Sequence, residues 1–95
     1  MLNMEMLEDI VYGALKEARI RYGDAWIDRI KVASRKIYVY MNVSGEKVKV
    51  IIYRDQIRVR VYSRLKGLSI ALQRIYEREY HKAYKRWERE RKKSL

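Results

Sequence analysis

Residues 47–62 read KVKVIIYRDQIRVRVY, and this stretch decides the expected fold. On either side of Arg54 and Asp55, apolar residues alternate with basic or aromatic residues. Such alternation is typical of a strand with one buried face and one face in water. The stretch therefore predicts two antiparallel strands, 47–53 and 56–62, joined by a tight turn.

The residues before this hairpin also have a period of two, which predicts two more strands at 26–33 and 36–43. The links between successive strands are very short, and short links join neighbouring antiparallel strands. The sheet spanning residues 26–62 is therefore expected to be a four-stranded meander.

The register of the strands follows from the placement of the turns. With turns at 34–35, 45–46 and 54–55, the apolar residues of all four strands form one continuous face. The expected pairs on this face are Val32–Ile37, Ile30–Val39, Val43–Val48, Met41–Val50, Val39–Ile52, Ile52–Ile57, Val50–Val59 and Val48–Val61. On the opposite, open face, the expected pairs of the last hairpin are Ile51–Arg58, Lys49–Arg60 and Lys47–Tyr62.

A first helix is expected before the sheet, over residues 3–22. Asn3 is a good capping residue, acidic side chains follow in the first turns, and apolar residues recur at helical spacing. Gly23 is expected to end this helix, because a glycine readily adopts the left-handed backbone conformation that often follows the last helical residue.

A longer helix is expected after the sheet, over residues 64–93, with Ser63 or Ser69 as its cap. At about 1.5 Å per residue it is longer than any strand, so a basic overhang should begin at about residue 77. Both helices can cover the apolar face. The expected fold is therefore a single α+β domain over residues 1–95, a two-layer sandwich in the order helix, four strands, helix.

Positive charge is concentrated in the second part of the chain. The net charge is +11; residues 1–25 carry three basic and five acidic side chains, and the remaining residues carry twenty and seven. A localised positive field attracts polyanions such as nucleic acid. High charge with few Asn and Gln resembles the composition of small proteins from thermophilic archaea or their viruses.

The composition also limits the chemistry and the compartment. There is no Cys, which excludes disulfides, thiolate metal sites and a Cys nucleophile. The first ten residues are acidic, unlike a signal peptide, and no apolar run approaches the roughly 18 residues of a membrane span. We therefore expect a soluble, cytoplasmic protein that does not enter a membrane.

The open face is expected to carry tyrosines at its centre and cations at its edges. Aromatic rings among cations suit nucleic acid, because bases stack on rings while cations follow the phosphates. The like-charge pair Lys49–Arg60 would lower stability by about a few tenths of a kcal/mol, and a bound polyanion would relieve it. The expected nucleic-acid-binding residues are Arg29, Lys31, Tyr38, Tyr40, Lys49, Tyr53, Arg58, Arg60 and Tyr62 on the sheet, with Arg86, Arg89 and Lys92 on the last helix.

An aromatic stripe runs along the last helix. Its members are Tyr76, Tyr80, Ala83 and Trp87, which step by four, three and four residues like a heptad seam. If the stripe lies in the overhang, the sheet cannot cover it, and it predicts a homodimer through this helix. The sequence equally allows the first helix, or a bend, to cover the stripe.

Three functions remain open from the sequence. The first is a small basic nucleic-acid-binding protein with little sequence preference, no cofactor, no metal and no small-molecule substrate. The alternative is an interaction, inhibitor or scaffold protein that uses the same faces. The sequence also allows these faces to be exposed only to water, with no binding role. The third is a metal-dependent nuclease, which the spacing of Glu46 and Lys47 and the lone His81 do not favour. Its candidate carboxylates are Glu8, Glu17, Asp24, Asp28 and Glu46.

Overall fold

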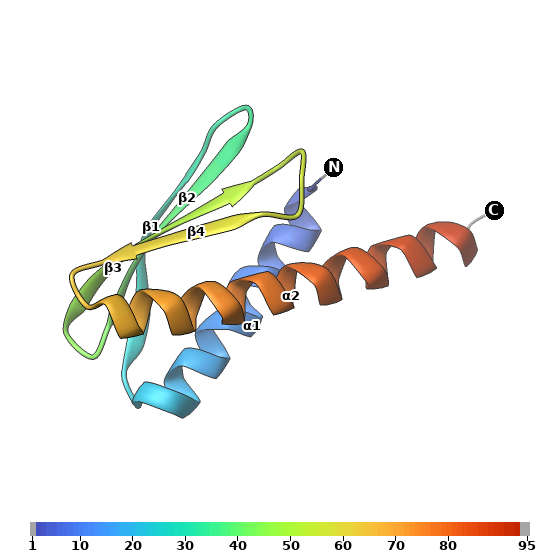
Figure 1. Cartoon of the computed structure of the whole chain (residues 1–95). Coiled ribbons are helices and arrows are strands. Elements are labelled where there is room, and N and C mark those ends of the chain that lie inside the picture. Colours follow the sequence, from blue (N-terminus) through green and yellow to red (C-terminus); the bar gives the residue numbers. More distant parts are fainter. Residues whose placement is uncertain (1, 94–95) are drawn as a thin grey trace.

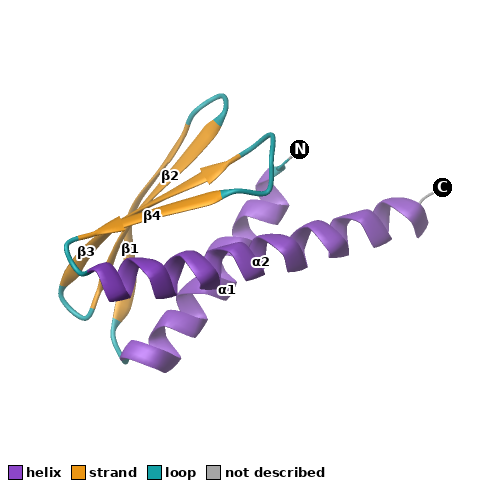
Figure 2. Ribbon diagram, in the orientation of Figure 1, coloured by secondary structure: helices purple, strands orange, loops and turns teal. Residues whose placement is uncertain are grey.

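The computed structural model describes residues 2–93 and confirms the expected α+β order. Its elements are α1 (Met4–Tyr22), β1 (Ala25–Val32), β2 (Lys36–Val43), β3 (Glu46–Tyr53), β4 (Val59–Ser63) and α2 (Lys66–Lys93) (Figure 1). The strands form one antiparallel sheet in the order β1-β2-β3-β4. Both helices lie on the same side of this sheet, and its other face is open (Figure 2).

The core lies between the sheet and the two helices. Residues of β2 alternate between buried and half-buried positions, as the period of two requires. The largest buried side chains come from α2: Tyr76 donates its hydroxyl hydrogen to Met41 Sδ at 2.9 Å, and Tyr80 donates to the Tyr53 carbonyl at 2.6 Å. These hydrogen bonds offset the cost of burying two hydroxyl groups.

The ends of α1 agree with the expected helix over residues 3–22. The Asn3 side chain accepts a hydrogen bond from the Met6 N–H at 2.8 Å, which satisfies a donor at the start of the helix. Gly23 has φ 83, and its N–H donates to the Arg19 carbonyl, which closes the other end.

The first hairpin has the expected register near its turn, where Val32 pairs with Ile37. A β-bulge between Ile27 and Arg29 then inserts Asp28 as an extra residue. Because side chains alternate with a period of two, one extra residue moves all earlier side chains of β1 to the opposite face. The sequence alternation had not predicted this reversal.

The pairing register of the second hairpin, β2 with β3, differs from the expected register by two residues. Met41 pairs with Val48 rather than Val50, because the turn is Ser44-Gly45 instead of 45–46. Ser44 and Gly45 both have positive φ, 50 and 84, as a type I′ turn requires. Two side chains favour this turn: Asn42 accepts from the Gly45 N–H at 2.9 Å, and Ser44 donates to the Tyr22 carbonyl at 2.8 Å.

The third hairpin is also shifted by two residues, because its loop is longer than two residues. Val50 pairs with Val61 rather than Val59, and β4 begins only at Val59. The expected Ile52–Ile57 pair does not form. The loop over residues 54–58 is tied to the rest of the fold by three hydrogen bonds of 3.0 Å: Leu2 N–H to Arg54 C=O, Arg54 N–H to Arg35 C=O, and Tyr53 N–H to Arg58 C=O.

α2 begins at Lys66, and the two serines expected to cap it do not do so. The hydroxyl of Ser63 donates to the Leu65 carbonyl, and that of Ser69 donates to the Lys66 carbonyl. The C-terminal part of α2 extends past the sheet (Figure 1). Tyr80 still donates a hydrogen bond to the Tyr53 carbonyl of β3, so this part begins later than the expected residue 77.

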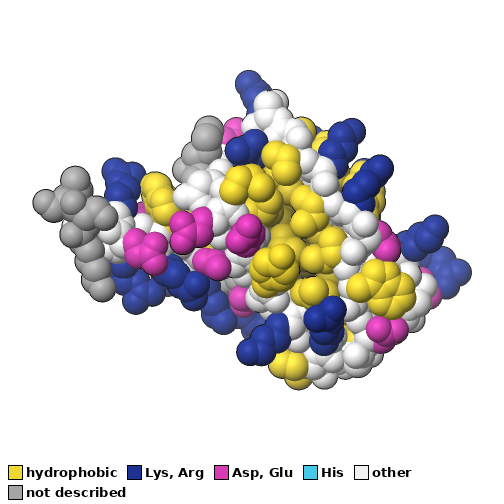
Figure 3. All heavy atoms as spheres, turned by 180° about the vertical axis from the view of Figure 1, so that it is seen from behind, with side chains coloured by type: hydrophobic (Ala, Val, Ile, Leu, Met, Phe, Trp, Pro, Cys, Tyr) yellow, Lys and Arg dark blue, Asp and Glu magenta, His cyan; other side chains and the backbone are white. Residues whose placement is uncertain are grey.

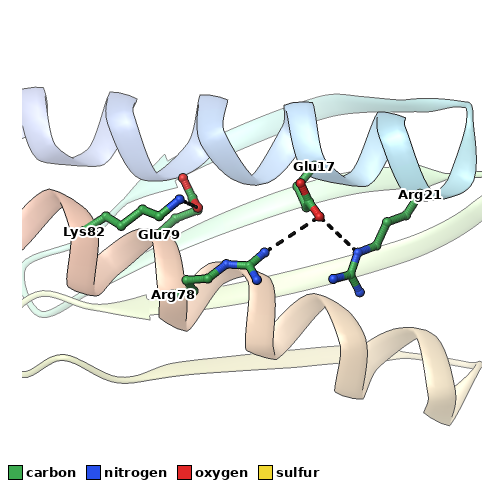
Figure 4. A network of polar contacts seen from close by, with 5 residues as sticks. All are labelled: Glu17, Arg21, Arg78, Glu79 and Lys82. Atoms are coloured by element: carbon green, nitrogen blue, oxygen red, sulfur yellow. Dashed lines mark hydrogen bonds and ion pairs between the residues drawn. The ribbon is translucent and has the colours of Figure 1, made fainter.

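The aromatic stripe of α2 does not form the exposed homodimer seam that its expected position in the overhang predicted. Tyr76, Tyr80 and Ala83 are buried in the core of the same chain, and Trp87 is half-buried against it. The reason is that α1 packs along α2 well past the middle of that helix. Ion pairs join the two helices, Glu17 with Arg78 at 3.8 Å and Asp9 with Arg86 at 3.1 Å. The first of these is drawn in Figure 4, with the neighbouring pairs Glu17–Arg21 and Glu79–Lys82.

Candidate nucleic-acid interface

The open face of the sheet carries rows of cations and aromatic rings across the strands. Its strand residues pair in four rows: Trp26–Asn42–Lys47, Arg29–Tyr40–Lys49–Tyr62, Lys31–Tyr38–Ile51–Arg60 and Lys36–Tyr53. Arg58, in the loop before β4, adds a seventh cation beside Tyr53. The composition of the face agrees with the sequence analysis, although the rows are arranged differently.

The expected contact between Lys49 and Arg60 does not exist in this arrangement. Lys49 lies opposite Tyr62, and Arg60 lies opposite Ile51, because the last hairpin is shifted by two residues. A shift of two keeps both cations on the open face while it separates them with an aromatic and an apolar side chain. The face therefore does not carry the like-charge strain predicted for that pair.

Three central tyrosines hold cations over their rings. The Arg29 guanidinium lies 4.7 Å from the centre of the Tyr40 ring, and Lys49 Nζ lies 5.3 Å from that of Tyr38. Tyr53 has two such neighbours, at 5.5 and 5.2 Å: Lys36 and Arg58. Cation–π attraction holds the charged groups close to the sheet surface. These rings are half-buried and partly covered, so they position cations more than they offer free stacking surfaces.

The cations of the open face have no carboxylate partner within 4.0 Å among residues 2–93. Ion pairs lie instead in the helix layer and, between Arg64 and Glu46 at 2.8 Å, at the start of β3. Each acidic partner in the helix layer neutralises a cation of that layer. The positive charge of the sheet is therefore not neutralised by carboxylates of the helix layer.

The two most exposed aromatic rings of this face lie on its edge strands. Tyr62, on β4, is 55% exposed, and Trp26, on β1, is 42% exposed. The indole N–H of Trp26 donates to Asp28 Oδ1 at 2.8 Å, which fixes the ring at the border of the face. A hollow of about 370 Å³ opens on the face and is lined by Asp28, Arg29, Tyr40, Met41, Lys47, Val48, Lys49 and Tyr62.

Sequence reasoning missed Trp26, and a signal for it was present. Ala25 and Ile27 are odd-numbered apolar residues, whereas Ile30 and Val32, also on the core side, are even-numbered. This change of parity can be accommodated by one extra residue between the two pairs, which is the bulge at Asp28.

The three expected binding residues of α2 are not brought together with those of the sheet. Arg86 pairs with Asp9 of α1 on the helix side of the molecule. Arg89 and Lys92 are exposed on the part of α2 that extends past the sheet (Figure 1). The sheet residues, in contrast, share one continuous surface.

The described residues do not support a metal site or a membrane-spanning helix. Within residues 2–93, no group of three or more His, Cys, Asp or Glu side chains is placed to hold a metal ion. His81 is exposed on α2. Over the same residues, neither helix combines the length and the apolar character needed to cross a membrane.

Searches of family models, curated proteins and solved structures found no match to this chain.

Proposed function

We propose that this protein binds nucleic acid, largely independently of sequence, through the open face of its sheet. The observation that carries the proposal is the set of cations on that face, which lack carboxylate partners and are interleaved with aromatic rings. Charge that a fold leaves unneutralised on one surface attracts a polyanion to that surface.

The side chains divide into two roles. Lys and Arg contact phosphates, and the cations held over Tyr38, Tyr40 and Tyr53 do so from positions close to the sheet. Trp26 and Tyr62 stack on bases, because their rings are the most exposed on the face. None of these contacts requires a particular base, since every base has a face that can stack.

The binding should depend steeply on salt. A single strand that contacts six cations would give a slope of roughly −4 in log affinity against log salt concentration. Fluorescence anisotropy titrations of labelled single- and double-stranded DNA and RNA, at two salt concentrations, measure this slope. Absence of binding to all four ligands at low salt contradicts the proposal.

A pair of charge-reversal variants locates the site. Lys49→Glu with Arg60→Glu reverses two cations of the open face, on the neighbouring strands β3 and β4, and should weaken binding by about 100-fold or more. Lys16→Glu with Arg74→Glu changes the net charge equally, but on exposed residues of α1 and α2. If this control weakens binding as much as the first variant, the open face is not the site.

The alternative role as an interaction protein predicts a different salt dependence. A stable complex with another protein that survives high salt would favour it, since apolar contacts are not screened. A metal-dependent nuclease would instead cleave one of the four nucleic acids with Mg²⁺ or Mn²⁺ present.

A further inference from the structure

A patch of apolar side chains is exposed between α1 and β1, away from the open face. Figure 3, which views the molecule from behind, shows apolar side chains gathered over these two elements. The exposed members of this α1–β1 patch are Met4 and Tyr12 of α1 with Ile30 and Val32 of β1; half-buried Ile27 and buried Leu7, Val11 and Leu15 lie between them. Contiguous exposed apolar surface of this kind usually marks a contact with another molecule.

The patch exists because neither helix covers the second half of β1. Ile30 and Val32 pair with Val39 and Ile37 and thus point to the helix side of the sheet. They are nevertheless exposed, while their partners on β2 are buried. A hollow of about 500 Å³ separates α1 from β1 there, and buried Leu7, Val11 and Leu15 form its floor.

Charged side chains of both signs lie on α1 along the patch. Glu8 lines the hollow near the start of the helix, and exposed Lys16 lies further along the helix, directly after Leu15. The cations of β1, Arg29 and Lys31, point to the open face instead. A two-fold axis that lies in the plane of contact and crosses α1 near Tyr12 would place Glu8 of each copy against Lys16 of the other.

The distribution of charge also favours the α1–β1 patch, over the other surfaces of the molecule, as the place where a second copy binds. Two chains of net charge +11 repel one another, and the acidic residues of the first 25 positions make α1 the least basic part of the molecule. We propose that a second copy of this chain packs its own α1–β1 patch against this one in a two-fold dimer. Because the patch lies on the helix side, both open faces remain accessible, and the proposal does not depend on their function.

The dimer should be weak and should strengthen with salt. The repulsion between two chains of net charge +11 opposes association, so a dissociation constant in the micromolar range is expected. Salt screens the repulsion between the two positive chains and leaves the apolar contact intact. Nucleic-acid binding should respond to salt in the opposite direction.

Sedimentation equilibrium of the pure chain, from micromolar to several hundred micromolar at low and high salt, tests the proposal. The wild type should dimerise, and Ile30→Lys should weaken dimerisation by about tenfold or more. Ile70→Lys is the matched control, because Ile70 is similarly exposed on α2, 46% against 41% for Ile30. It should leave the dimer unchanged.

A second variant keeps the test decisive even where Ile30→Lys unfolds the protein. Tyr12 is 64% exposed on α1, so Tyr12→Lys should weaken the dimer without affecting the fold, which circular dichroism checks. A wild type that stays monomeric throughout overturns the proposal. A patch that binds a different protein, and not a second copy, would give this result. Equal weakening by Ile30→Lys and Ile70→Lys overturns it as well.

Discussion

At the scale of single residues, Asp28 determines which side chains of β1 reach the open face. As the extra residue of the bulge, it brings Trp26 opposite Asn42, and its carboxylate accepts the indole N–H. Without the bulge, Trp26 would point to the helix side, as its spacing from Ile30 suggests. One residue therefore supplies both the position and the orientation of an exposed aromatic ring.

Gly13 is a second residue whose role depends on one neighbour. It lies in the middle of α1, where an added Cβ would overlap the Glu79 carboxylate of α2. Gly13→Ala normally stabilises a helix by about 1 kcal/mol, but here Glu79 must first move away. We expect no gain in the wild-type background and a gain of about 1 kcal/mol in Glu79→Ala, measured by urea unfolding. The same gain in both backgrounds would contradict this contact.

At the scale of elements, two tyrosines of α2 link the stability of the fold to alkaline pH. Burial, and then the negative charges of Asp55 and ionised Tyr84, raise the pKa of Tyr80 to about 12. Burial alone raises the pKa of Tyr76 well above its usual value. An unfolded tyrosine ionises near pH 10, so folding favours the neutral form. The resulting stability is complete below about pH 10 and is lost as the pH rises through the folded-state values.

The double variant Tyr76→Phe with Tyr80→Phe isolates this effect. Its free energy of unfolding should be lower at pH 8, because the Tyr53 carbonyl loses its donor and such a bond contributes about 1 kcal/mol. Between pH 10 and 12, however, its stability should fall less than that of the wild type. Urea unfolding at several pH values measures both quantities, and parallel decline of the two proteins would show that these hydroxyls do not cause the pH dependence.

The elements also explain what could be predicted from the sequence. The alternation in 47–62 predicted the strands and their buried face, and an error of two residues in two hairpins left the paired side chains on their faces. Ile57 is the exception, because it lies in the loop before β4 and is exposed. The turn at Ser44-Gly45 depends on side-chain hydrogen bonds to Asn42 and Tyr22, which alternation does not encode. The coverage of Tyr76 and Tyr80 depends on how α1 crosses α2, which is a property of tertiary packing.

At the scale of the whole molecule, the fold separates charge into two layers. Carboxylates of the helix layer pair with cations of the same layer, as in the network of Glu17, Arg21 and Arg78 (Figure 4). The sheet keeps its cations without such partners among the described residues. The sequence predicted the excess of positive charge and most of the cations and tyrosines of the open face, but only the fold shows that Arg86 is paired with Asp9 of α1.

The two tryptophans lie at the two surfaces that could bind a polyanion, so each reports on one of them. Trp26 is on the open face, and Trp87 is on α2 with Arg91 5.3 Å from its ring. The most direct test of the proposed interface is therefore fluorescence quenching by single-stranded nucleic acid in two single-tryptophan variants. In Trp87→Phe, where Trp26 remains, binding should quench the emission, because bases stack on that ring. In Trp26→Phe, emission from Trp87 should stay nearly constant as the strand binds; quenching of Trp87 alone would place the site on α2 and contradict the account.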